Sequence, residues 1–422
     1  MTETKLHSGT GALLSACCLT LWTGTLLGQT SSVDSALAAT AQGGVVYVGG
    51  LTHGTLPGQV NAGGKDAFVR TYDPNGNELW TRQFGSAADD QVMGLAADAT
   101  GIYVVGLTYG ALPGQTYLGQ DDAFIRKYDL NGNELWTQQF GTKGYDRATA
   151  VAVDGNGVYV AGATSGVLPG QTRIGGEDAF LRMYDPDGNE LWTCQFGTTG
   201  LDRAYGVTSD ATGVYVAGRT DGVFSGQTAA GGIDAFLGKF DTFGNLLWVR
   251  QFGTPRDDRG WAVAVDATGV YIAGRVEDPL PGQTYIGDDD AYIRKYDADG
   301  NELWTVQFGT TSFDRVFAMV ADSFGIHVAG VTEGTLPGQT NLGANDSFLC
   351  TYDTLGNEVW TRQFGTKAVD VGNAVTSDST GIYVAGRTGG KFPGQTHATS
   401  SDVYLVKYDF NGNMLWVREF GT

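Results

Sequence analysis

The stretch GNELWTRQFG, residues 76–85, decides the fold, because close copies of it recur along the whole chain. Its tryptophan returns at a constant interval of 56 residues, as in 136 minus 80 and 192 minus 136. The seven tryptophans of this series are Trp80, Trp136, Trp192, Trp248, Trp304, Trp360 and Trp416. A period without drift indicates one structural unit that is built seven times.

Each repeat contains four short segments of strand character. In the third repeat, segments with alternating or β-rich apolar residues are separated by the turns DGNG and DPDGN and by a longer connection that contains LPGQ. The four segments are residues 148–153, 158–162, 178–184 and 190–196. Alternation of period two between Asp/Asn-Gly turns is typical of antiparallel hairpins. The sequence therefore predicts an all-β, seven-bladed β-propeller with four antiparallel strands in each 56-residue blade.

A family resemblance rests on the run AVAVDGNGVYVAG at residues 150–162, on DAF at 178–180, on DPDGN at 185–189 and on Trp192. These motifs resemble the seven-bladed β-propeller (SBBP-type) repeat of bacterial surface and secreted proteins, and the strand order is similar to that of NHL-type propellers. The resemblance covers residues 33–422, and the first copy departs most, because residues 35–42 lack the usual turn aspartate. It implies that the Ala/Val strand lines the central channel, that the Trp strand is outermost, and that blade seven closes the ring on blade one. The family shares no catalytic residues, so the resemblance implies no activity.

Residues 1–32 differ in composition from the repeats, whose blades are expected to start near residues 34, 90, 146, 202, 258, 314 and 370. The apolar stretch 11–27 after Lys5 and His7 resembles a bacterial export signal. Two alternatives stay open: LSAC at residues 14–17 is similar to a lipoprotein processing box, and LWT at 21–23 is similar to a strand remnant. The prediction is an exported protein, periplasmic or at the cell surface.

Charge and cysteine content exclude several classes of function. The chain has 26 basic and 46 acidic residues and a net charge of −20, which disfavours nucleic-acid binding. No stretch after the first 32 residues is apolar for long enough to span a membrane. The four cysteines, Cys17, Cys18, Cys194 and Cys350, form no CxxC pair or Cys/His cluster, so no metal, cofactor or disulfide framework is predicted.

A recurrent aspartate marks the connection into the first strand of each blade: Asp34, Asp90, Asp146, Asp202, Asp258, Asp314 and Asp370. On four consecutive blades an arginine follows it: Arg147, Arg203, Arg259 and Arg315. Because these residues enter the innermost strand, we expect an acidic ring with a basic arc at one end of the channel, the channel mouth. The arginines together with Asp146, Asp202, Asp258 and Asp314 form the candidate ligand site, since guanidinium groups bind carboxylates in a bidentate manner. The alternative is structural: each aspartate caps a loop, and each arginine pairs with it or with the next blade.

The long loop of each blade contains a Pro-Gly-Gln core in six copies, yet two of its positions vary widely. Varied polar and aromatic residues on a constant frame suit a recognition surface, although plain solvent exposure explains them too. The candidate residues at these positions are His53, Tyr109, Tyr117, Arg173, Tyr285, Asn341 and His397.

Other motifs have structural explanations. The turns at residues 73–77 and 297–301 resemble calcium loops but lack the further carboxylates, so turn chemistry accounts for them. The seven tryptophans are expected to pack between blades. The four histidines share no motif, and no catalytic residues are predicted.

The sequence as a whole favours a non-catalytic binding or adhesion module that recognises a glycan or a protein through the face with the long loops. The alternative is a structural or assembly protein of the cell surface. A hydrolase with a carboxylate site at the channel mouth is a third hypothesis.

Overall fold

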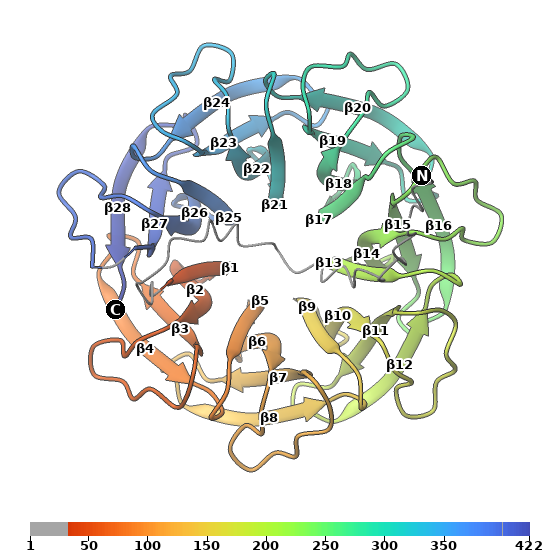
Figure 1. Ribbon diagram of the computed structural model, residues 1–422, viewed down its shortest axis with the longest axis horizontal. Helices are drawn as coiled ribbons and strands as arrows, with labels where there is room; N and C mark the ends of the chain where they lie inside the picture. The colour runs from red at the N-terminus through yellow and green to blue at the C-terminus, as the bar shows by residue number, and fades with distance from the viewer. Residues whose placement is uncertain (1–32, 399) are drawn as a thin grey trace, which may run out of the picture. The chain divides into compact units, whose positions relative to one another are not determined.

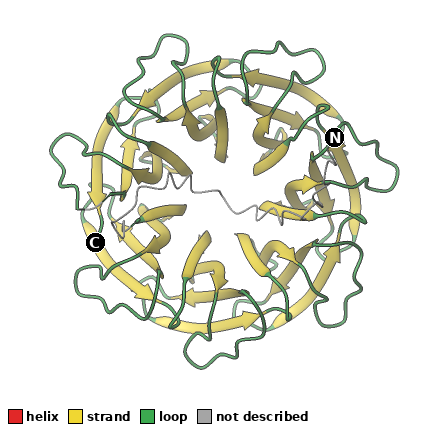
Figure 2. Cartoon of the chain, viewed as in Figure 1, coloured by secondary structure: helices red, strands yellow, loops and turns green. Residues whose placement is uncertain are grey.

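The computed structural model describes residues 33–398 and 400–422, and the leader predicted at residues 1–32 lies outside them. The described residues form seven four-stranded antiparallel sheets arranged around a central axis (Figure 1). Each sheet consists of four strands that are consecutive in sequence, and we call the sheets blades one to seven. Figure 2 shows strands and loops only. The predicted all-β, seven-bladed propeller is therefore confirmed.

The strands of each blade follow one another from the axis to the rim (Figure 1). The innermost strands are β1 (Ser35–Gln42), β5 (Asp90–Asp98), β9 (Asp146–Val153), β13 (Asp202–Asp210), β17 (Arg259–Asp266), β21 (Asp314–Asp322) and β25 (Asp370–Asp378). The second strands are β2 (Val45–Thr52), β6 (Gly101–Thr108), β10 (Val158–Thr164), β14 (Gly213–Thr220), β18 (Gly269–Val276), β22 (Gly325–Thr332) and β26 (Gly381–Thr388). The third strands are β3 (Asp66–Tyr72), β7 (Asp122–Tyr128), β11 (Asp178–Tyr184), β15 (Asp234–Phe240), β19 (Asp290–Tyr296), β23 (Asp346–Tyr352) and β27 (Asp402–Tyr408). The outermost strands, which carry the tryptophans, are β4 (Glu78–Phe84), β8 (Glu134–Phe140), β12 (Glu190–Phe196), β16 (Leu246–Phe252), β20 (Glu302–Phe308), β24 (Glu358–Phe364) and β28 (Met414–Phe420).

The hydrophobic core lies between neighbouring blades. The second and third strands are buried along almost their whole length, because each of their faces packs against another blade. Between blades one and two, Tyr47 and Val69 pack with Ile102 and Phe124. Burial of this kind, repeated at each junction, holds the ring together.

A β-bulge in the innermost strand brings two backbones close together. In blade two the register between β5 and β6 shifts after Val92, and the backbone oxygen of Gln91 approaches Gly106. A Cβ atom on Gly106 would lie 1.8 Å from that oxygen, so only glycine fits at this point.

The outermost strand links each blade to the next through its tryptophan. The Trp80 indole Nε1–H donates to the Leu130 carbonyl in the turn of blade two at 3.1 Å. The same bond closes the ring, since Trp416 of blade seven donates to Pro74 of blade one at 3.1 Å. The expected packing of tryptophans between blades, and the closure of blade seven on blade one, are thus both observed.

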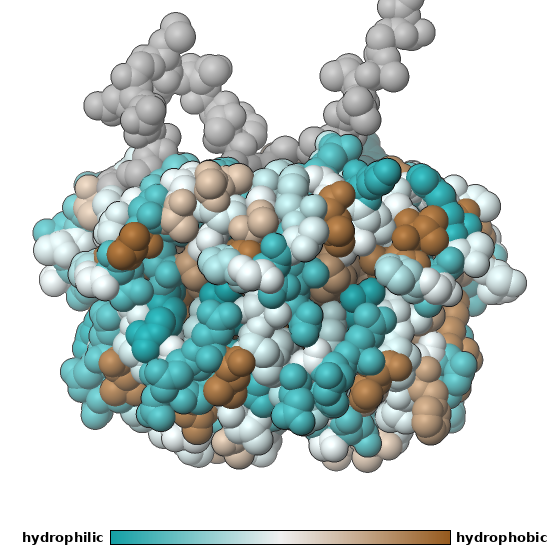
Figure 3. All heavy atoms as spheres, turned by 90° about the horizontal axis from the view of Figure 1, so that it is seen from below, coloured by the Kyte–Doolittle hydropathy of each residue, from teal (hydrophilic) through white to brown (hydrophobic). Residues whose placement is uncertain are grey.

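The long loop of one blade and the connection into the next blade lie together. At six of the seven junctions they form a single parallel β-bridge, for example between Ile233 and Asp257. The channel mouth is the end of the central channel on the side of these bridges, where the innermost strands begin. Seen from the side, the surface is mainly hydrophilic, with separate hydrophobic spots (Figure 3). No helix within the described residues has the length and hydropathy needed to cross a membrane.

Candidate functional site

The recurrent aspartates at the channel mouth are fully buried and hold their own connections. In blade three, Asp146 Oδ2 accepts the backbone N–H of Thr142 at 2.6 Å, and Oδ1 accepts the hydroxyl of Thr164 at 2.5 Å. The same bond from the residue four positions earlier is made to Asp90, Asp202, Asp258, Asp314 and Asp370. Across the ring closure, Asp34 accepts the backbone N–H of Thr422 at 2.7 Å. These carboxylates, among them Asp146, Asp202, Asp258 and Asp314, are therefore used inside the scaffold, and their role in ligand binding stays a prediction.

In blades two to seven burial raises the pKa of the recurrent aspartate, and most strongly in blade five. The pKa of Asp90 and of Asp314 is raised to about 6, while backbone and hydroxyl hydrogen bonds oppose the rise. The pKa of Asp258 is raised to about 7. In blade three the hydroxyl of Thr164 donates to Asp146, but in blade five the corresponding residue is Val276, which has no hydroxyl group.

Three of the four arginines of the basic arc bind a carboxylate of the preceding blade. In each case the acidic residue stands 26 positions earlier, just before the third strand. The Nε···O distances are 2.8 Å for Arg147 and Asp121, 2.7 Å for Arg203 and Glu177, and 2.7 Å for Arg315 and Asp289. The structural alternative for the arginines is therefore observed, with a partner in the preceding blade.

Asp289 binds two arginines at the junction of blades five and six. Its Oδ2 lies 2.6 Å from Nη1 of Arg275, in the second strand of its own blade, and 2.7 Å from Nε of Arg315. Glu277 adds a second carboxylate, 2.8 Å from Nη1 of Arg275. Asp289 is 2% exposed, so its charge is compensated almost entirely by these guanidinium groups.

At the junction of blades four and five the same three positions hold Arg219, Ile233 and Arg259. The backbone is unchanged: the N–H of Asp258 donates to the carbonyl of Ile233 at 2.7 Å, as that of Asp314 donates to Asp289 at 2.8 Å. An isoleucine side chain accepts no hydrogen bond. The position that carries the shared carboxylate between blades five and six is thus apolar here.

Arg219 is the buried member of this junction. It is 4% exposed, and its Nε has no hydrogen-bond partner among the described residues. It lies directly opposite Arg203 in the register of β13 and β14, so two guanidinium groups enter the same region. A buried donor of this kind, left without an acceptor, costs roughly 1–3 kcal/mol.

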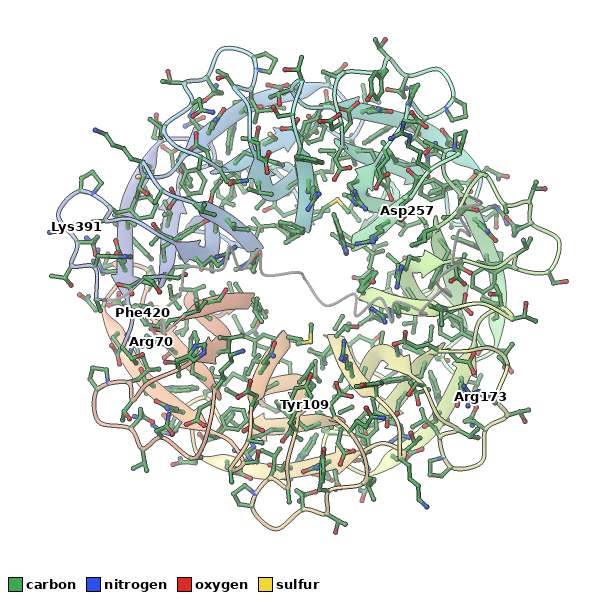
Figure 4. The ribbon with its side chains drawn as sticks, viewed as in Figure 1. Arg70, Tyr109, Arg173, Asp257, Lys391 and Phe420 are labelled. Atoms are coloured by element: carbon green, nitrogen blue, oxygen red, sulfur yellow. The ribbon has the colours of Figure 1, made fainter. Side chains whose placement is uncertain are left out.

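Two carboxylates stand close to Arg219 and Arg259 in sequence. Asp221 occupies the position of Glu277, but its Oδ1 accepts the backbone N–H of Leu201. Asp257, labelled in Figure 4, directly precedes the Asp258-Arg259 pair at this junction. Among the described residues, neither carboxylate forms an ion pair with an arginine.

The other junctions show that arginine and acid occur together. Where the recurrent aspartate is followed by Ser35, Gln91 or Val371 instead of an arginine, the preceding blade holds a residue that is not acidic; these residues are Ser401, Lys65 and Asn345. The signal for these pairs lies in two repeat positions that are 26 residues apart: the arginine position and the position before the third strand of the preceding blade. Comparing the two positions across the copies would have identified Asp121, Glu177 and Asp289 as partners, and Ile233 as the exception.

The variable loop positions do not gather into one patch. His53 Nδ1 is 2.8 Å from the carbonyl oxygen of Val33 near the ring closure. Figure 4 shows Tyr109 nearer the axis and Arg173 on a loop at the rim.

Most of the outer variable residues bind their own loop. The Tyr117 hydroxyl donates to the Gln120 carbonyl at 2.7 Å, and Arg173 Nε donates to the Gly175 carbonyl at 2.8 Å. Asn341 donates to the carbonyl of Gly334 at 3.2 Å. Tyr285 is half exposed.

His397 differs from the other variable residues, because it meets two buried carboxylates. Its Nδ1 lies 2.7 Å from Oε1 of Glu419 and 3.3 Å from Oδ2 of Asp402. His397 was predicted as a binding residue from its variable loop position, but Glu419 and Asp402 were not predicted. The signal was present in the repeat: position 419 is glutamine in each of the other six copies.

No family model matches the sequence. Over 210 residues the chain is 29% identical to the regulatory protein FlaEY of Caulobacter vibrioides, which covers 46% of this chain and 22% of that protein. Over 409 residues it is 22% identical to the uncharacterized WD repeat-containing protein L264 of Acanthamoeba polyphaga mimivirus, which covers 71% of this chain and 29% of that protein. The chain thus spans less than a third of the length of either relative.

Solved structures similar to this chain are propellers. The WD40 domain of Neurospora crassa Pan2 has a TM-score of 0.51 and 10% identity, over 83% of this chain and 85% of that one. The WD40 propeller domain of Doa1 has a TM-score of 0.46 and 11% identity, over 85% of this chain and 90% of that one. At such low identity the likeness concerns the fold alone.

Proposed function

We propose that this chain is a non-catalytic protein-binding module that recognises an acidic group of its partner at the channel mouth, where blades four and five meet. The observation that carries the proposal is the replacement of the shared carboxylate by Ile233, beside a buried Arg219 that, unlike Arg275, forms no ion pair among the described residues. A carboxylate supplied from outside would take the place that Asp289 has between blades five and six.

The arrangement at Asp289 supplies the template for this recognition. There one carboxylate oxygen is within 2.7 Å of two guanidinium groups from neighbouring blades. Hydrogen bonds between ionised groups are roughly twice as strong as neutral ones, and guanidinium groups favour planar anions. A glutamate, an aspartate or a C-terminal carboxylate of a protein fits this chemistry.

A protein is favoured over a neutral glycan because of the side chains on offer. The outer variable residues Tyr117, Arg173 and Asn341 bond to their own loops, so they do not form a platform on which sugar rings stack. An acidic oligosaccharide presents the same carboxylate as a protein and is therefore the second arm of the test. The comparison with WD repeat proteins agrees with a binding role but carries the fold alone.

The test is a selection of displayed random peptides on the full chain, with the variant I233D as the matched control. Ile233→Asp recreates the residue that blade five has at this position and fills the site with the chain's own carboxylate. We expect peptides with a glutamate, an aspartate or a free C-terminus to be enriched on the unchanged chain and not on I233D. A panel of acidic oligosaccharides is measured with the same two proteins.

Either of two outcomes contradicts the proposal: peptides enriched equally on both proteins, or no enrichment on a well-folded chain. The second outcome favours the structural or assembly role. Turnover of an oligosaccharide in the panel would favour the hydrolase hypothesis.

We also propose export to the periplasm or cell surface, on the basis of residues 1–32. Detection of the chain in periplasmic and surface fractions tests this proposal.

A further inference from the structure

Blade seven departs from the other blades at a buried polar contact near its outer edge. In the other six blades a glutamine in the outermost strand joins the long loop to the aspartate that starts the third strand. In blade one, Gln83 Oε1 accepts the N–H of Leu56 at 2.8 Å, and Nε2 donates to Asp66 Oδ2 at 2.8 Å. The remaining five glutamines make both bonds: Gln139, Gln195, Gln251, Gln307 and Gln363.

In blade seven this glutamine is replaced by Glu419. Its Oε2 keeps the bond to the loop, from the N–H of Phe392 at 2.9 Å. The other oxygen, Oε1, stands in place of the amide nitrogen and cannot donate to the aspartate, here Asp402. The side chains of Glu419 and Asp402 are both 0% exposed, so two acidic groups share a buried site. Two buried carboxylates cannot both stay charged side by side unless a cation or a shared proton lies between them.

His397 completes the cluster from the long loop that also carries Lys391 (Figure 4). One nitrogen, Nδ1, faces both carboxylates, and the three candidate ligand atoms all lie within 4.8 Å of one another. Asp402 Oδ2 is oriented by the backbone N–H of Ala398 at 2.6 Å. Blades one and six have an asparagine in place of His397, and its amide bonds to loop carbonyls instead.

The donor set and its spacing suit a divalent transition metal. Zinc binds histidine nitrogen and carboxylate oxygen at about 2.0–2.2 Å, which places ligands of a tetrahedral site roughly 3.3–3.5 Å apart. The distance from His397 Nδ1 to Asp402 Oδ2 is 3.3 Å, and that to Glu419 Oε1, now 2.7 Å, would open on binding. Calcium and magnesium prefer oxygen ligands alone, so the histidine favours zinc or a similar ion.

We propose that blade seven binds one divalent transition-metal ion, with Zn²⁺ as the best match, through His397 Nδ1, Asp402 Oδ2 and Glu419 Oε1. With three protein ligands the ion keeps a fourth position for water, on the side where His397 is 20% exposed. The ion joins the long loop of blade seven to its third and fourth strands, the connection that the glutamine makes elsewhere.

The test is a calorimetric titration of Zn²⁺ into the metal-free full chain and into three variants. E419Q and H397N introduce residues that blades one and six already have at these positions. Q363E places a carboxylate in blade six without a histidine and controls for acidity alone. We expect one site in the unchanged chain and in Q363E, and a loss of affinity of at least about tenfold in E419Q and H397N, the lower limit seen when even a supporting residue of a metal site is changed.

Absorption spectra with Co²⁺ separate this site from the thiols of the chain, because nitrogen and oxygen ligands give no thiolate charge-transfer band. Equal binding by E419Q, H397N and the unchanged chain would overturn the proposal, as would the absence of binding by the unchanged chain. In the latter case His397 serves only as the donor that replaces the glutamine amide.

Discussion

Two neighbouring junctions of the ring have the same backbone and differ in charge. Between blades five and six, Asp289 binds Arg275 and Arg315. Between blades four and five, Ile233 stands where the carboxylate would be, and both arginine positions are kept as Arg219 and Arg259. Arg219, buried at the junction without the acid, forms no ion pair among the described residues. The comparison teaches that one copy of a repeat can serve as the reference for another.

The largest expected effect comes from removing the carboxylate that two arginines share between blades five and six. In D289I the buried Arg275 and the partly exposed Arg315 lose their shared carboxylate, and only Glu277 remains for Arg275. Removing one partner of a buried ion pair costs about 3–5 kcal/mol, so the free energy of unfolding should fall by about 3 kcal/mol. Denaturant unfolding measures it. A change below about 1 kcal/mol would show that this pair behaves as an exposed one.

Introducing a carboxylate between blades four and five should change the free energy of unfolding in the opposite direction. In I233D a carboxylate enters beside Arg219, which forms no ion pair among the described residues, at the position from which Asp289 binds Nη1 of Arg275. We expect the free energy of unfolding to rise by about 2 kcal/mol, the middle of the range for satisfying a buried polar group. The same unfolding experiment applies. A destabilised I233D would mean that the region does not accept a carboxylate.

Replacing the buried arginine should also stabilise the chain. R219L introduces the residue that blades one and two have at this position, Leu51 and Leu107. An apolar side chain in place of a buried charge without a partner should raise the free energy of unfolding by about 1 kcal/mol. It should abolish peptide binding as well. Peptide binding that survives in R219L would place the recognition elsewhere.

The smallest expected difference between a variant and the unchanged chain concerns the pH dependence of stability at the same junction. The folded-state pKa of Asp258 is about 7, above its ordinary value, so the folded chain holds a proton that the unfolded chain has released. Stability is therefore lost as pH rises from about 4 to 7, with a slope of up to about 1.4 kcal/mol per pH unit for one group.

The variant V276T restores the threonine that the other six blades have at this position, where Thr164 donates to Asp146 in blade three. It should lower the pKa of Asp258 toward about 6, the pKa of Asp314, whose blade has Thr332 at this position, and stabilise the chain by up to about 1 kcal/mol above pH 7. Unfolding curves between pH 5 and 8 measure this. Parallel pH profiles for V276T and the unchanged chain would contradict the assignment.

The fold could be predicted from the sequence because the sequence features that determine it are local or periodic. The interval between Trp80 and Trp136 fixes the blade, and the Asp-Gly turns fix the hairpins. Even the closure followed, since seven complete copies leave blade seven only blade one to contact. The four arginines at the channel mouth were also found from their spacing.

The partners of those arginines were not found, because pairing across a junction depends on which loops meet. Arg315 and Asp289 are 26 residues apart and belong to different blades, and a single parallel bridge brings their segments together. The metal cluster was missed for the same reason: His397, Asp402 and Glu419 come from a loop and two strands. In both places the informative residue, Ile233 or Glu419, is a departure from the repeat.

The most direct test of the central claim is the unfolding of the full chain and of I233D in chloride and in acetate at equal ionic strength. A carboxylate that binds only the folded state stabilises it in proportion to RT ln(1 + [L]/Kd). We predict that acetate stabilises the unchanged chain more than I233D, with a difference that grows with the logarithm of the acetate concentration once that concentration exceeds Kd. An identical response of the two proteins to acetate would contradict a carboxylate site between blades four and five.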